Sequence, residues 1–201
     1  MARHRRGNRL GASRRRVLRA GVGLIVGLAV AAHTPYRQWD VYRMKHLLIG
    51  TSREDAPSYP LGKRVASLLA EVAPETDARV TRARGLERLG SLLSTGQLQV
   101  LLLSRPHLAQ LAAGTGPFAA FGPTAVARLF RFGELSLISR ADFPAPHAWV
   151  VTRALMDSAG GLGGTPPDSA AGPAPIHPGT RAALEGRAMP EAGEDDGGTD
   201  P

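Results

Sequence analysis

The amino-acid sequence predicts an α/β domain with a small, mostly parallel sheet flanked by helices. Apolar stretches of strand length alternate with stretches in which apolar residues recur at helical spacing. Residues 99–103 (QVLLL) form a continuous apolar run, which is typical of a strand covered on both faces in a parallel sheet. Because parallel strands need crossover connections, the alternation indicates right-handed strand–helix–strand units.

One domain of this kind is expected over residues 45–158. Its strands are expected at residues 46–51, 78–81, 99–103 and 135–139. Its helices are expected at residues 59–72, 86–95, 106–113 and 124–132, and within 143–158 from about Pro146, with a loop rich in Gly, Pro and Phe at residues 114–123.

Glycine and proline residues near the ends of the first expected strand and helices support their boundaries. The strand over 46–51 is an apolar run that ends in a glycine. Pro60 suits the first turn of the helix over 59–72, where its missing N–H is not needed, and Pro74 ends that helix. The helix over 86–95 is expected to end at the C-cap Gly96, and it carries one leucine stripe: Leu86, Leu89, Leu92 and Leu93.

The composition changes after residue 158. Residues 159–201 are rich in Gly, Pro and Ala and end in an acidic stretch, EAGEDDGGTDP. Segments of this composition bury too little apolar surface to offset the entropy of ordering. This C-terminal tail is therefore expected to be largely disordered.

The charge is concentrated at the N-terminus. The chain of 201 residues has 25 basic and 17 acidic residues, a net charge of +8, but residues 1–19 contain eight arginines and no acid. Setting those eight aside leaves 17 basic residues against 17 acidic ones, so the body is neutral. A nucleic-acid-binding domain carries its positive charge on the folded part. No nucleic-acid partner is expected.

Residues 1–32 have the layout of an export signal or an N-terminal membrane anchor. The stretch SRRRVLR, with Arg14 and Arg15, resembles the twin-arginine export motif, and an uncharged apolar run with an A-x-A sequence follows it. Tyr36, Trp39 and Tyr42 lie in the following linker, residues 33–44, and suit a membrane interface. Cleavage and anchoring remain alternatives. Both place the body in the periplasm or on the outer face of the cytoplasmic membrane.

No pattern of catalytic or metal-binding residues is present. The chain has no cysteine. None of the histidines considered as catalytic candidates, His46, His107, His147 and His177, lies in an HExxH, GxSxG or phosphate-loop pattern. Neither an enzymatic activity nor a metal or cofactor is expected.

Several motifs resemble the TAXI family of solute-binding proteins, which serve TRAP-type transporters. Residues 50–62 (GTSREDAPSYPLG) match the family pattern G-T-G-G-x-G-G-x-Y-Y-P-x-G at Gly50, Thr51, Tyr59, Pro60 and Gly62. Residues 92–102 (LLSTGQLQVLL), TGPF and HPG also have counterparts in the family, in the same order. The resemblance implies a type II periplasmic-binding-protein-like lobe. The chain between residues 118 and 135 is short, so the second lobe is expected to be largely missing.

The resemblance also implies a ligand and a partner. A small carboxylate-like solute would bind where the first strand leads into the first helix, at Thr51, Ser52, Ser58 and Tyr59, and a TRAP-type permease would receive it. Four family glycines are replaced here, by Ser52, Arg53, Asp55 and Ala56. The negative charges of Glu54 and Asp55 would oppose an anion unless Arg53 compensates them. The alternative is a membrane-tethered accessory or interaction module of the same fold that has lost solute capture.

Overall fold

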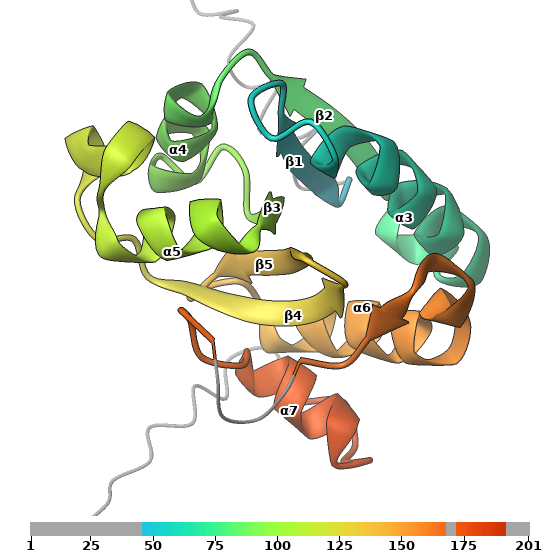
Figure 1. Cartoon of the computed structure of the whole chain (residues 1–201). Helices are drawn as coiled ribbons and strands as arrows, with labels where there is room; N and C mark the ends of the chain where they lie inside the picture. The colour runs from blue at the N-terminus through green and yellow to red at the C-terminus, as the bar shows by residue number, and fades with distance from the viewer. Residues whose placement is uncertain (1–45, 168–171, 192–201) are drawn as a thin grey trace, which may run out of the picture. The chain divides into compact units, whose positions relative to one another are not determined.

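A six-stranded mixed sheet forms the centre of the computed structural model, which describes residues 46–167 and 172–191 (Figure 1). The strand order is β2-β1-β3-β5-β4-β6. The strands are β1 (Leu48–Ser52), β2 (Arg79–Ala83), β3 (Val100–Ser104), β4 (Val126–Phe132), β5 (Leu135–Arg140) and β6 (Gly164–Thr165). The expected export motif at Arg14 and Arg15, the anchor and the linker over 33–44 lie outside the described residues.

Helices cover both faces of this sheet, so the expected α/β fold with flanking helices is confirmed (Figure 1). The α-helices are α3 (Ser58–Val72), α4 (Leu86–Ser94), α5 (Arg105–Ala113), α6 (Ala145–Ser158) and α7 (Pro178–Leu184). Short 3₁₀ helices are η1 (Pro74–Thr76), η2 (Gly116–Phe121) and η3 (Ala159–Leu162). No described helix has the length and apolar character needed to cross a membrane.

The two halves of the sheet differ in how their strands pair. β1 pairs in parallel with both β2 and β3, through the crossover helices α3 and α4. β5 pairs antiparallel with β3 and β4, and β4 pairs antiparallel with β6. The prediction of a mostly parallel sheet is therefore wrong for the described residues, because only the first half is parallel.

The second half differs from the prediction because residues 124–132 do not form a helix. They contain the strand β4, which leads into β5 through Gly133 and Glu134. A connection of two residues can join only antiparallel neighbours. Gly133 has a φ of +59°, a conformation that glycine adopts without strain.

The two faces of the sheet bury separate apolar clusters, and β3 contributes to both. Leu102 lies in the cluster under α3 and α6, whereas Leu101 and Leu103 lie in the cluster under α4 and α5. The alternation follows from the two-residue period of a strand. It explains why the sequence of β3 is apolar at every position from 100 to 103.

The C-terminal tail is not disordered where the structure describes it, so the expectation of disorder and the domain boundary at residue 158 are wrong for residues 159–167 and 172–191. β6 adds an edge strand, and α7 packs against α6. Buried small residues make this packing close, and the hydroxyl groups of Thr152 and Thr180 lie 2.9 Å apart between the two helices. Composition alone predicted disorder because a close helix contact and a flexible linker are both rich in Ala and Gly.

His177 fixes the start of α7. Its side chain is only 2 % exposed. Nδ1 accepts a hydrogen bond from the Gly179 N–H at 3.1 Å, so Nε2 carries the proton and donates to the Phe143 carbonyl at 2.9 Å. Burial lowers the pKa of His177 below its usual value, although the hydrogen bond to Phe143 acts in the opposite direction. The H-P-G motif thus has a structural role in this chain.

The lowered pKa of His177 predicts that the fold loses stability in mild acid. Because its folded pKa lies below the unfolded value of about 6.5, the unfolded chain binds more protons as the pH falls below 6.5. The free energy of unfolding should then fall by at most about 1.4 kcal/mol per pH unit from this residue, until the folded pKa is reached. Urea unfolding of the full chain at several pH values, compared with His177→Gln, measures the effect. Equal pH dependence in both proteins would contradict it.

Candidate functional site

The edge of the sheet at the carboxyl ends of β1, β2 and β3 is the candidate location of a functional site. The three strands are parallel, so the segments that follow Ser52, Ala83 and Ser104 meet at this edge. Ligands of open α/β sheets bind outside the carboxyl ends of their strands. The residues predicted to bind a solute belong to the first of these segments.

Three of the predicted ligand residues are fully buried. The Thr51 hydroxyl donates a hydrogen bond of 2.8 Å to the Thr81 carbonyl, and the Ser58 hydroxyl donates one of 2.7 Å to the Asp55 carbonyl. The Ser52 hydroxyl accepts from the Glu54 N–H at 3.2 Å, and the Ser58 hydroxyl accepts from the Ser52 N–H at 3.4 Å. The structure brings Ser52 and Ser58 together, and it uses all three hydroxyl groups inside the fold.

Tyr59, the fourth predicted ligand residue, is partly exposed and contacts cations of this chain. The Arg82 guanidinium carbon lies 4.7 Å from the centroid of the ring, and the Lys63 ammonium nitrogen lies 5.3 Å from it. Such contacts stabilise a positive charge over the aromatic face. The ring therefore has neighbours within the fold that do not involve a solute.

Two carboxylates of the same segment bind backbone amides at the sheet edge. Glu54 Oε2 accepts from the Leu86 N–H at 2.9 Å, where α4 begins. Asp55 Oδ2 accepts from the Ser104 N–H at 2.8 Å, where β3 leads into α5. Amides at a helix start attract anions. The carboxylates of Glu54 and Asp55 thus satisfy amides at the starts of two helices on this edge.

The glycine at the start of α4 permits one of these contacts. A Cβ atom at Gly85 would lie 2.9 Å from Glu54 Oε1. Gly85 is the N-cap residue of α4 and has no side chain to satisfy the first amides, so Glu54 supplies the acceptor from a distant part of the chain. From the sequence, Glu54 and Asp55 were expected only to oppose an anion through their negative charges. Their capping role joins residues 32 and 49 positions apart, and no local motif reveals it.

His107 lies beside Asp55, but the arrangement is not a catalytic triad. The Ser104 hydroxyl lies 2.9 Å from His107 Nδ1, and Asp55 Oδ2 lies 3.5 Å from the same nitrogen. In a triad the serine and the carboxylate bind different ring nitrogens, so that one orients the ring while the other accepts the proton. Here both partners meet at Nδ1. This geometry lacks a carboxylate on the second ring nitrogen to orient the imidazole, and it suits a network that fixes the start of α5.

The open surface next to these contacts is polar and of mixed charge. A shallow hollow of about 410 Å³ is lined by Glu54, Arg84, Gly85, Glu87, Arg88 and Pro117. A larger hollow, of about 550 Å³, lies at the opposite edge, next to the residues that precede β1 and β3. Its lining includes Leu47, Gln99, Phe143 and Val150. Within the described ranges, no three His, Cys, Asp or Glu side chains gather closely enough to hold a metal ion.

No protein-family model matches the chain, and no curated protein matches it. The resemblance to the TAXI receptors therefore rests on the motifs of the sequence.

Proposed function

We propose that this chain is an accessory or interaction module with a fold like one lobe of a solute-binding protein, and that it does not capture a solute at the loop after β1. One observation carries this proposal. The carboxylates of Glu54 and Asp55 already accept from the amides of Leu86 and Ser104, at the edge where a carboxylate solute would bind. A solute would have to displace both contacts and enter beside two negative charges.

The burial of the predicted ligand residues supports the same conclusion. Thr51, Ser52 and Ser58 are fully buried, and their hydroxyl groups are engaged within the fold. The hollow beside Glu54 is shallow, whereas small-molecule sites enclose most of the surface of their ligands. The parallel half of the sheet is consistent with the type II lobe that the motifs suggest.

The proposed location follows from the leader, and the proposed partner follows from the resemblance to the TAXI receptors. The arginine-rich start and the apolar run predict that the module works at the outer face of the cytoplasmic membrane. A membrane protein, such as a TRAP-type permease, is the proposed partner. The neutral body makes nucleic acid an unsuitable one.

A panel of small carboxylates tests the loss of solute capture. Each compound at 1 mM is expected to leave the melting temperature of the full chain unchanged. A solute with a Kd of 10 μM would raise the free energy of unfolding by about 2.7 kcal/mol, a shift of several degrees. Glu54→Gln removes one of the two opposing charges, and Glu71→Gln, on the exposed side of α3, is the matched control. A carboxylate that stabilises the wild type at this concentration, and stabilises Glu54→Gln more than Glu71→Gln, would refute the proposal.

Solute capture elsewhere in the fold is the second candidate, because the hollow at the opposite edge has a suitable size. Its volume of about 550 Å³ lies within the range of small-molecule sites, and its lining is mainly apolar. If a compound of the panel shifts the melting temperature, Val150→Trp should abolish the shift by filling this hollow. A shift that survives in Val150→Trp would place the compound elsewhere.

A further inference from the structure

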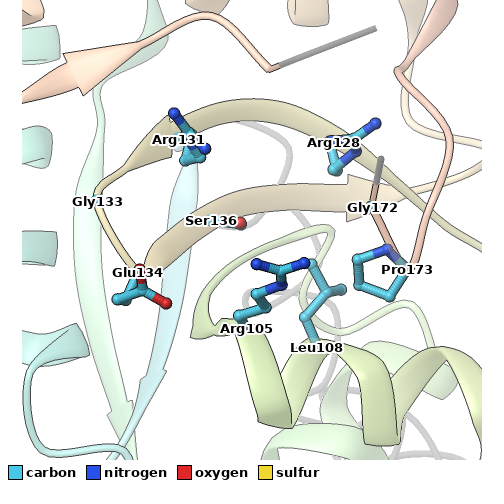
Figure 2. A pocket seen from close by; sticks show the side chains of 9 residues that line it. All are labelled: Arg105, Leu108, Arg128, Arg131, Gly133, Glu134, Ser136, Gly172 and Pro173. Carbon is cyan, nitrogen blue, oxygen red and sulfur yellow. The ribbon is translucent and has the colours of Figure 1, made fainter. Parts of the chain in front are cut away.

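We propose that the β4–β5 hairpin and the start of α5 form a binding site for an oxyanion, a phosphate or carboxylate group. A hollow of about 60 Å³ lies at the hairpin and is lined by Arg105, Leu108, Arg128, Arg131, Gly133, Glu134, Ser136, Gly172 and Pro173 (Figure 2). Figure 2 shows the side chains of Arg105, from α5, and of Arg128 and Arg131, from β4, around the strand face that carries Ser136.

A β-bulge places two of the arginines on one face. Side chains of a regular strand alternate, so residues three apart, such as Arg128 and Arg131, would point to opposite faces. The pairing of β4 with β5 shifts by one residue between Arg128 and Phe130. As a result, the adjacent residues Leu129 and Phe130 both pack into the cluster under α3 and α6, and both arginines line the hollow on the other side. Bulges commonly re-aim side chains at functional sites.

Contacts with the C-terminal segment hold Arg128 in place. Its side chain is only 8 % exposed, and Nε donates to the Ala174 carbonyl at 2.7 Å. The Arg128 N–H also donates to the Pro175 carbonyl at 2.7 Å. A Cβ atom at Gly172 would lie 2.6 Å from the Arg128 guanidinium carbon, so the segment passes directly over the guanidinium. A guanidinium fixed in this way loses little conformational entropy when an anion binds.

The other polar groups of the hollow come from the hairpin and from α5. The backbone N–H of Arg105 donates to the Glu134 carbonyl at 3.0 Å, which ties the start of α5 to the turn between the strands. Arg131 Nε lies 3.5 Å from the Thr165 hydroxyl of β6. Ser136 stands opposite Arg131 in the strand pairing and can add a hydroxyl donor. Three segments that are distant in sequence thus line one hollow: the start of α5, the β4–β5 hairpin and residues 172–173.

The chemistry of the lining selects an oxyanion. Three guanidinium groups and one carboxylate, that of Glu134, line the hollow. Arginine binds carboxylate and phosphate through parallel N–H···O bonds, and it is the side chain best suited to planar recognition of these groups. The volume of about 60 Å³ holds a group of a few atoms, and the remainder of a larger ligand would stay outside. The site therefore recognises an anionic group, either as a free ion or as part of a partner molecule.

To test the proposal, the full chain is titrated with inorganic phosphate and, separately, with acetate, at a constant ionic strength set by chloride. The backbone amide NMR signals of Gly133 and Ser136 report binding. Saturable shifts are expected with a Kd of several millimolar, too weak to move the melting temperature at the 1 mM used for the carboxylate panel. A negative result in this titration would therefore leave the proposed function unaffected, and a positive melting shift with the carboxylate panel would not come from this site. A stronger response to phosphate or to acetate identifies the group that the site prefers.

Substitutions with opposite expected effects make the test specific. Arg105→Gln and Arg131→Gln should each raise the Kd about tenfold, whereas Glu134→Gln should lower it a few-fold by removing a negative charge. Arg153→Gln, on the exposed side of α6, is the matched control for net charge and should leave the Kd unchanged. If Arg131→Gln unfolds the chain, Arg131→Lys keeps the charge but loses the paired bonds, and it should still weaken binding. Shifts that do not saturate, an equal effect of Arg153→Gln, or no gain in Glu134→Gln would overturn the proposal.

Discussion

Asp55→Ala is expected to lower the free energy of unfolding by about 2–3 kcal/mol. The Asp55 side chain is only 3 % exposed, and its Oδ2 accepts the Ser104 N–H at 2.8 Å. Removing the carboxylate leaves that amide without its acceptor in a part-buried position, and the charge-assisted bond is lost as well. His107 also loses the carboxylate that lies 3.5 Å from Nδ1. Urea unfolding measures the change as a lower midpoint at an unchanged slope.

Two further variants separate the capping role from a general effect of charge. Asp55→Asn keeps an oxygen that can accept from the Ser104 N–H, so it should cost about half as much as the alanine variant. Asp157→Ala removes a carboxylate that is 67 % exposed and 3.9 Å from Arg153, and it should change stability by less than about 0.5 kcal/mol. If Asp55→Ala proves as mild as Asp157→Ala, the network at the sheet edge does not stabilise the fold. A solute could then displace these carboxylates at little cost to the fold.

The parallel half of the fold could be predicted from the sequence because its signals are local. A two-faced apolar strand over 99–103, the leucine stripe of α4 and the prolines at 60 and 74 each act within a few residues. The α3 and α4 helices lie where these signals place them, within one or two residues at each end. The order β2-β1-β3 was not part of this prediction, because the crossover rule sets handedness and not strand order.

In the antiparallel half, β5 was predicted as the strand over 135–139, but β4 was not, because β4 carries a misleading pattern. Val126, Leu129, Phe130 and Phe132 fall at spacings that fit a helix as well as a strand. The β-bulge is the physical reason: it interrupts the alternation that marks a strand and brings Leu129 and Phe130 to the same core. The same bulge creates the pair of arginines in the proposed oxyanion site, so one irregularity concealed both the strand and the site.

The candidate site shows a similar limit. The loop after β1 was located correctly at the carboxyl edge of the sheet, but the sequence gives no sign that its hydroxyl groups are buried. Glu54 and Asp55 act on amides at positions 86 and 104, which the fold alone brings close. Whether such a carboxylate repels a ligand or replaces it depends on this long-range contact. Short motifs can therefore identify the loop, but they do not determine whether its side chains bind a ligand or backbone amides of the same chain.

Gly179→Ala is expected to lower the free energy of unfolding by about 3 kcal/mol or more. A Cβ atom at this position would lie 2.1 Å from the Ala145 carbonyl oxygen and 2.9 Å from its carbonyl carbon. Both atoms belong to the backbone, so no side chain can move aside, and the helices α6 and α7 would have to separate. Separation would also disturb the hydrogen bond from the Gly179 N–H to His177 and the contact between Thr152 and Thr180. Urea unfolding of the full chain measures the loss.

The sign of this effect decides whether the C-terminal segment belongs to the folded domain. In a helix that does not pack, replacing glycine with alanine is neutral or stabilises by up to about 1 kcal/mol, because alanine loses less backbone entropy. Gly161→Ala provides that reference, since its Cβ would meet nothing within 4 Å and its φ is not positive. A destabilised Gly179→Ala beside a neutral Gly161→Ala would establish that α7 is anchored on α6. If both variants are neutral, α7 does not hold the segment over residues 172–176 in place, and the Arg128 side of the oxyanion hollow would lose its cover with it.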